Sequence, residues 1–257
     1  MKPLQHILSY ILLPLTLLAT SCEENDTPEA KEPGTVTLDI HHTYNSEALQ
    51  LNQEYATEGG TGIKFRQLRY ILSNVVLTTD NGATYKVPDS YYIVEHTPTH
   101  TREQVALTGV PAGSYTSVSF AIGVDQTVNH SLDLAAGELA TVSGMAWSWN
   151  TGYKFIVAEG EAFNAATGAW ENYTYHVGTD ANYRTVTLAL PNALQVEKQT
   201  DSQVMLVAET GKLFNQVDVL QYKMVMSGAA TAAVATQVAA NYASMFSVHH
   251  AHSMKGN

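Results

Sequence analysis

The chain has 257 residues, with 13 Lys and Arg against 24 Asp and Glu, so its formal net charge at pH 7 is −11. A balance this acidic disfavours nucleic acids and anionic lipid surfaces as partners, because both repel a negative protein. The length suits one β-rich domain preceded by a short export segment.

The first residues are typical of an export signal. Lys2 supplies a positive start, and an apolar run follows over residues 7–19. This run is too short and too interrupted to remain as a membrane-spanning helix. It ends in the sequence LATSC at Cys22, and small residues before a Cys are what a lipoprotein signal peptidase accepts. We therefore predict a lipoprotein signal peptide over residues 1–21.

Cys22 is the only Cys in the chain, so it cannot form an internal disulfide. Lipid attachment gives it a role, and we predict that Cys22 is lipidated. Residues 22–34 are mostly polar and predict a flexible tether. No second apolar span and no second linker follow, so residues 35–257 are expected to form one domain, held at a membrane by its lipid alone.

Short alternating segments bounded by turn residues predict strands through most of this domain. In the first, residues 36–42, Ile40 and His42 face the interior, whereas His41 faces solvent. Asn81-Gly82 is a hairpin turn, because both residues tolerate positive φ. Further strands are expected at residues 63–78, 84–87, 91–94, 104–107, 114–124, 153–157, 170–177, 184–190 and 204–208.

Helical signal is confined to two places. Residues 229–245 are rich in Ala, a good helix former, and Val234, Val238 and Tyr242 fall at helical spacing. Residues 131–140 carry a second, shorter signal. The expected fold is all-β: a Greek-key sandwich or a flattened barrel with a C-terminal helix.

Histidine is the residue type that offers metal chemistry, and the chain has 10. Imidazole binds copper, zinc, nickel and iron. His42 faces inward at a strand end, where it is either a hydrogen-bonded structural residue or a ligand. His96 and His100 bracket a Pro-containing loop, and His249-His250-Ala251-His252 lies near the C-terminus, where exposed histidines also bind metals adventitiously.

Other site types find no support. With Cys22 assigned to lipid, no thiolate is left for a nucleophile, a blue-copper site or a zinc finger. The sequence lacks the motifs of serine hydrolases, phosphate-binding loops and helical zinc proteases. Trp147 and Trp149 form an aromatic stretch that either packs in the core or stacks on a sugar.

Six segments in this order carry a family resemblance: IHH at residues 40–42, LRYILSNV at 68–75, VPAGSY at 110–115, IGVD at 122–125, MAWSWNTGYKF at 145–155 and YHVG at 175–178. Together they resemble the MbnP-like family of periplasmic copper-binding proteins and lipoproteins. The resemblance covers nearly all of the predicted domain.

The resemblance implies a β-rich domain that binds one copper ion through histidines. His42 matches the family's His in the first strand, and His176 matches the His of its His-Leu-Gly segment. His252 lies where related lipoproteins often end in a His. In the best-known members a partner di-haem peroxidase-like enzyme oxidises a Trp to kynurenine, which supports copper binding. Trp147 and Trp149 both match the Trp-x-Trp segment that carries this residue.

We therefore expect a non-enzymatic lipoprotein of the cell envelope, anchored by lipid to the outer membrane at its periplasmic or surface face. It would bind copper for acquisition or storage, with His42, His176 and His252 as candidate ligands and zinc as the alternative ion. The alternative function, from a different class, is a surface lipoprotein that binds a glycan or a protein through the Trp147 and Trp149 region.

We expect Cys22→Ala to release the protein from membranes, because the lipid is the only anchor that the sequence predicts. Detergent-free fractionation of cells expressing wild type or variant measures this directly. Retention of the Cys22→Ala variant in the membrane fraction would show that another segment anchors the chain.

Overall fold

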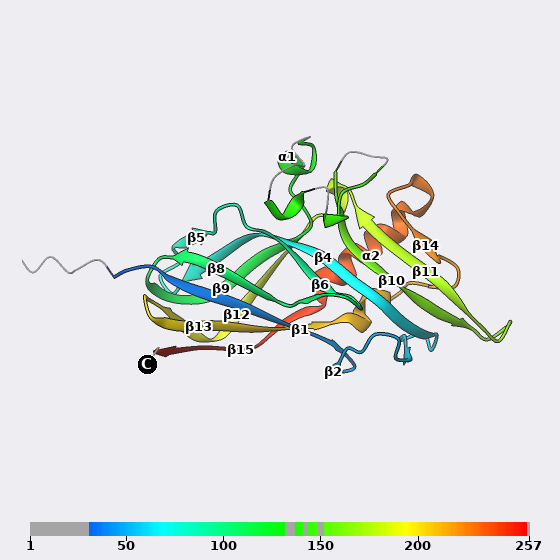
Figure 1. Cartoon of the computed structure of the whole chain (residues 1–257), viewed down its shortest axis with the longest axis horizontal. Coiled ribbons are helices and arrows are strands. Elements are labelled where there is room, and N and C mark those ends of the chain that lie inside the picture. The colour runs from blue at the N-terminus through cyan, green and yellow to red at the C-terminus, as the bar shows by residue number, and fades with distance from the viewer. Residues whose placement is uncertain (1–30, 132–136, 141–142, 149–151, 256–257) are drawn as a thin grey trace, which may run out of the picture. The chain divides into compact units, whose positions relative to one another are not determined.

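The computed structural model describes residues 31–131, 137–140, 143–148 and 152–255. Residues 31–257 form one compact unit (Figure 1). Residues 1–30, which include the expected signal peptide and Cys22, lie outside the described residues. The strands are β1 (Gly34–Tyr44), β2 (Glu47–Ala48), β3 (Tyr55–Ala56), β4 (Gly62–Thr79), β5 (Thr84–Lys86), β6 (Tyr91–His96), β7 (Thr101–Arg102), β8 (Gln104–Val110), β9 (Gly113–Ile122), β10 (Lys154–Asn164), β11 (Ala169–Gly178), β12 (Arg184–Val196), β13 (Thr200–Glu209), β14 (Met224–Val225) and β15 (Phe246–Lys255).

These strands form two open sheets. Sheet A has five strands in the order β15-β13-β1-β2, with β8 also paired to β1. Sheet B has ten, in the order β12-β9-β4-β10-β11-β14, with β3, β5 and β6 paired to β4 and β7 paired to β6. The expected all-β fold is confirmed, and of its two expected forms the chain adopts the sandwich.

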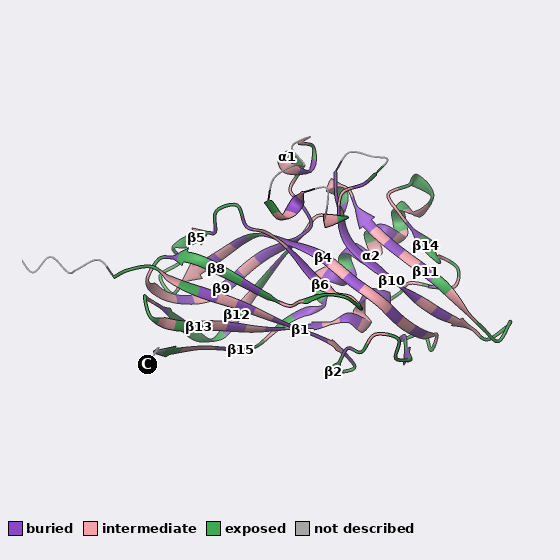
Figure 2. Cartoon of the chain, in the orientation of Figure 1, coloured by how far each residue is buried: buried purple, intermediate pink, exposed green. Residues whose placement is uncertain are grey.

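The core lies between the two sheets. Along β1, Leu38 and Ile40 are fully buried, because alternate residues of a strand point to the same face. The ring of Phe246 on sheet A lies 5.8 Å from Tyr70 and 5.1 Å from Phe120 on sheet B. In Figure 2 the long strands accordingly alternate between buried and less buried residues.

β4 is apolar on both faces because both faces of sheet B are covered there. Tyr70 faces the core between the sheets, whereas its neighbour Ile71 belongs to a second apolar cluster with Met145 and Phe155. The segment leading into β10 therefore lies over the outer face of sheet B. This explains why the sequence of β4 lacks the simple alternation of a half-exposed strand.

The expected C-terminal helix is confirmed as α2 (Ala232–Ser244), preceded by the 3-10 turn η5 (Ala229–Thr231). Its residues Val238, Ala239 and Tyr242 are buried. The other described helical turns are short: α1 (Gln126–Asn129), η1 (Gly137–Leu139), η3 (Asp180–Asn182) and η4 (Thr210–Phe214). None of the helices in the described residues is long and apolar enough to cross a membrane.

Two expectations need correction. Of the helix expected at residues 131–140, residues 132–136 lie outside the described part, and the described residues contain only η1. No strand was predicted after α2. The chain there forms β15, which pairs antiparallel with β13.

We expect Gly160→Ala to lower the free energy of unfolding by at least about 2 kcal/mol, the usual scale of overpacking. A Cβ at Gly160 would lie 1.8 Å from the carbonyl oxygen of Lys64 and 2.6 Å from the Tyr173 hydroxyl. Urea unfolding measures the loss. Gly228→Ala is the matched control, since a Cβ there has no neighbour within 4 Å. Equal stability of the two variants would contradict this packing.

Candidate metal centre

His42 is buried at the interface of the two sheets. β1 directs Leu38, Ile40 and His42 to the same face, and His42 is 4% exposed. Its neighbour His41 faces outward, where its Nε2 lies 3.3 Å from a carboxylate oxygen of Asp39. The orientation expected from alternation is therefore confirmed for both histidines.

Three side chains meet the His42 ring. Glu103, between β7 and β8, lies with its Oε1 2.6 Å from Nδ1 of His42 and 2.8 Å from Nδ1 of His96. Tyr70 lies on the other side, with its hydroxyl 3.1 Å from Nε2 of His42. We call His42, His96 and Glu103 the buried cluster, with Tyr70 as its neighbour.

Strand pairing explains how residues so far apart in sequence converge. The N–H of Ile40 donates to the carbonyl oxygen of Glu103 over 2.7 Å, which fixes Glu103 beside β1. On sheet B, His96 is the cross-strand partner of Leu68, two residues from Tyr70. Residues two apart on a strand share a face, so His96 and Tyr70 both point into the interface.

Burial decides the charge of this cluster. It lowers the pKa of His42 below the ordinary 6.5, because the loss of water outweighs the hydrogen bond and charge of Glu103. Burial also raises the pKa of Tyr70 well above 10. Burial alone would raise the pKa of Glu103 too, but the hydrogen bonds that it accepts from His42 and His96 lower it to about 2.

One protonation pattern satisfies all of these groups at neutral pH. Neutral His42 donates its Nδ1–H to the ionised carboxylate of Glu103, and its Nε2 accepts from the hydroxyl of Tyr70. His96 donates to the same carboxylate oxygen. The cluster therefore carries a partly buried negative charge that two imidazoles stabilise.

The buried cluster has the ligands of a metal site. One ligand atom from each of its three residues lies within 4.8 Å of the others, and the described part of the chain holds no second group of three His, Cys, Asp or Glu side chains that does so. Metal-bound N and O atoms lie about 2.0–2.2 Å from a zinc-type ion, hence about 3.4 Å apart in a tetrahedron. The distances of 2.6 and 2.8 Å would need to open only slightly.

Tyr70 fits either state of His42. With an ion on Nδ1, the ring proton moves to Nε2 and donates to the Tyr70 oxygen. Such an outer hydrogen bond fixes the tautomer and the orientation of a metal-bound imidazole. The residues present therefore fit a metal ion, as well as the hydrogen-bonded arrangement described above.

His176 lies on the other face of sheet B. Val157 on β10 is the cross-strand partner of both His176 on β11 and Arg69 on β4. Cross-strand partners point to the same face, so His176 shares the face of Arg69, whereas the next residue, Tyr70, points to His42. The structure thus does not bring His42 and His176 together. Nε2 of His176 lies 2.7 Å from Oε1 of Glu159.

Trp147 lies beside His176, with ring centroids 6.4 Å apart. It is 7% exposed, and its ring is close to Gly178, where a Cβ would lie 3.2 Å from ring atoms. Trp147 therefore does not offer a ring face to a sugar. Trp149, the other Trp named by the resemblance, lies outside the described residues.

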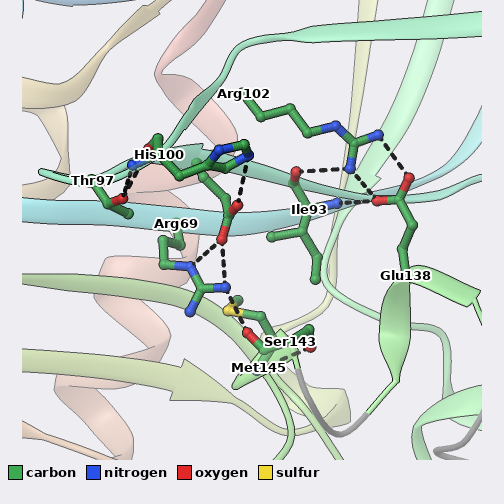
Figure 3. A network of polar contacts seen from close by, with 9 residues as sticks. Arg69, Ile93, Thr97, His100, Arg102, Glu138, Ser143 and Met145 are labelled. Carbon is green, nitrogen blue, oxygen red and sulfur yellow. Dashed lines mark hydrogen bonds and ion pairs between the residues drawn. The ribbon is translucent and has the colours of Figure 1, made fainter.

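A network of ion pairs holds the segment that carries Trp147 (Figure 3). Arg69 donates from Nε to Glu95 over 2.7 Å and from Nη2 to the carbonyl oxygen of Ser143 over 2.6 Å. Arg102 donates from Nη2 to Glu138 over 2.7 Å, and Glu138 also accepts the N–H of Ile93. Glu138 and Ser143 are thereby attached to β4, β6 and β7.

His252 lies far from the buried cluster. It pairs with Gln203 on β13, and Gln203 pairs with Thr37 on β1. Thr37 and His42 are five residues apart on β1, which corresponds to about 16 Å along a strand. The ring neighbour of His252 is His250, with their centroids 5.2 Å apart. The structure therefore places the three candidate ligands, His42, His176 and His252, in three different surroundings.

Sequence reasoning missed Glu103 and Tyr70 and gave His96 no role. Glu103 is 61 residues from His42, and nothing local marks it. The one available signal was the spacing of His96 and Glu103 around a short Pro-containing loop, which is typical of two strands that pair and face the same partner.

The comparison with family models identifies the family. The family model of MbnP matches residues 33–227, which include His42, His96, Glu103 and His176. A solved structure of MbnP from Methylosinus trichosporium is similar, with a TM-score of 0.49 and 16% identity over 76% of this chain and 81% of that chain. No curated protein matches the chain.

In the metal-free protein we expect the free energy of unfolding to decrease as the pH is lowered from neutral. Below pH 6.5 His42 binds a proton in the unfolded chain but stays neutral in the folded protein, because its folded pKa is lowered. Below pH 4.5 the same holds for Glu103, whose folded pKa is about 2. Urea unfolding in chelator across this range measures the slope.

Glu103→Gln should flatten the part of this slope below pH 4.5, since the amide does not titrate. Glu47→Gln, at an exposed position on β2, is the control and should leave the slope unchanged. A Glu103→Gln protein with the wild-type acid dependence would show that the carboxylate is not ionised in the folded cluster.

Proposed function

This chain belongs to the MbnP family, and on that premise we propose that it binds copper through histidines outside the cytoplasm. The observation that carries the proposal is the buried cluster, in which two imidazoles and one carboxylate meet. The biological role that we propose is copper acquisition or storage.

The ligand set supports copper among the metals of the cell envelope. Imidazole nitrogen suits copper and zinc, and for a given set of N and O ligands Cu²⁺ binds most tightly of the first-row divalent ions. Zinc is the alternative ion for the same residues. Because the imidazoles must be unprotonated to bind, affinity should fall in acid.

A binding role fits this cluster better than catalysis. The side chain of His42 is 1% exposed and those of His96 and Glu103 are 19% and 27% exposed, so an ion there would offer little open surface to a substrate. A buried ion held between two sheets is well placed for storage or for slow transfer. We propose that the protein is not an enzyme.

The Trp147–His176 pair is a second candidate copper site, because the family resemblance names both residues. It lies on the opposite face of sheet B from the buried cluster, so both sets cannot hold the same ion. If a di-haem peroxidase-like partner oxidises a Trp here, Trp147 is the described residue whose product would stand beside His176. Mass spectrometry of the purified protein detects such a change in Trp147 or Trp149.

We further propose that the protein acts in the cell envelope as a lipoprotein attached through Cys22. The apolar segment, the small residues before Cys22 and the polar tether after it support this assignment. The lipid would hold the copper-binding domain close to a membrane without inserting the domain itself.

Copper retention tests the site. Replacement of a metal's outer-shell partner commonly costs 10–100-fold in affinity, so we expect His42→Ala or His96→Ala to cost at least about 100-fold and to remove one copper equivalent after desalting. His41→Ala is the control, because His41 is the neighbour on β1 that faces solvent.

His176→Ala separates the two locations. If the buried cluster holds the ion, this variant keeps the equivalent that His42→Ala loses. Wild-type copper content in both His42→Ala and His96→Ala, with loss in His176→Ala, would move the site to the Trp147 face of sheet B.

A further inference from the structure

Strand β15 carries three histidines at the edge of sheet A. The strand order of this sheet begins at β15, which pairs with β13 on one side (Figure 1). Edge strands have one unpaired side. His249 is exposed, and His250 and His252 are partly exposed, so an ion in solution can reach all three.

A β-bulge changes the direction of one of these side chains. Met205 on β13 pairs with His250, but the next residue, Leu206, pairs with Val248. His249 is thus an extra residue without a cross-strand partner. Val248 and Ala251 both pack toward the core although they are three residues apart, which requires such an insertion. Bulges re-aim side chains and occur often at sheet edges.

The bulge brings consecutive histidines together. Nδ1 of His249 lies 2.9 Å from Nδ1 of His250, whereas consecutive side chains of a regular strand point to opposite faces. The ring of His252 lies 5.2 Å from that of His250, at 33° between their planes. His250 therefore has an imidazole neighbour on each side on the outer face of sheet A, while the ligand atoms of the three rings do not all lie within 4.8 Å of one another.

These rings differ from the other described histidines. Each of the other six makes a contact with a carboxylate: His41 with Asp39, His42 and His96 with Glu103, His100 with Glu95, His130 with Asp180 and His176 with Glu159. In the described part of the chain, the polar contact of His249 and His250 is with each other. Imidazole lone pairs gathered without an acid leave room for a cation.

We propose that His249 and His250 form a second, exposed site that binds Cu²⁺, and that His252 joins it by rotation of its side chain. Two nitrogens 2.9 Å apart and each bound at about 2.0 Å subtend about 93° at the ion, by the bond length usual for imidazole. This is close to the right angle between neighbouring ligands of tetragonal Cu²⁺. The pair can therefore supply two neighbouring ligands of a Cu²⁺ ion.

The exposed site adds a step to the proposed function. Copper held at the edge strand can exchange with solvent or with a copper-carrying partner, whereas the buried cluster is shielded by both sheets. The site has its own ligands, so it stands or fails independently of the buried cluster.

Copper titration of the whole domain tests the inference. We expect two Cu²⁺ equivalents by calorimetry, with the edge-strand ion showing several nitrogen ligands by electron paramagnetic resonance. The double variant His249→Gln/His250→Gln should lose one equivalent and that signal, and His252→Ala should weaken the same signal. Zn²⁺ should compete poorly for this site.

His130→Ala is the matched control, because His130 is an exposed histidine that Asp180 already holds. An unchanged copper count in the double variant would overturn the inference. Equal affinities of the wild type and of His249→Gln/His250→Gln for the second Cu²⁺ equivalent would overturn it as well.

Two further results keep this test separate from that of the buried cluster. His42→Ala should lose the buried equivalent and keep the edge-strand signal. Unfolding temperatures equal to that of the wild type would show that β15 stays paired in the Gln variants. A Gln variant that loses β15 pairing is replaced by His252→Ala alone, whose unchanged signal would also count against the site.

Discussion

A buried imidazole needs a partner at each of its two nitrogens, and His42 has them in Glu103 and Tyr70. The carboxylate of Glu103 is held beside His42 because β1 also binds the backbone of Glu103: the N–H of Ile40 donates to its carbonyl oxygen. Leaving either ring nitrogen unpaired would cost about 1–3 kcal/mol. This contact therefore specifies how β1 of one sheet stands against β4 and β6 of the other.

The hairpin of β6 and β7 serves both faces of sheet B. His96 and Glu103 point to the core side, and Glu95 and Arg102 point to the outer side, as alternation requires. Arg102 of the outer pair binds Glu138, and Glu95 binds Arg69, which in turn holds the carbonyl oxygen of Ser143. One hairpin thus contributes to the buried cluster and to the contacts of Glu138 and Ser143 on the outer face.

The described histidines fall into two electrostatic classes. Those paired with a carboxylate are held in one tautomer by a strong hydrogen bond, which gives a defined geometry but must open to admit an ion. The rings on β15 have no such bond in the described structure, and they remain near solvent. Copper binding as proposed would benefit from both, because tight retention and ready exchange place opposite demands on a single site.

Alternation in the sequence was enough to predict an all-β domain, its principal strands and the inward direction of His42. Helical spacing was enough for α2. These features depend on neighbours a few residues apart. β15 was not predicted, because its bulge places Val248 and Ala251 on the same face although they are three residues apart, which breaks the two-residue period of a strand. Only the tertiary structure could join His42 to Glu103 across 61 residues. Only strand register could place His176 on the face of sheet B that points away from His42. Pairing between strands decides which side chains meet, and no local sequence pattern records that pairing.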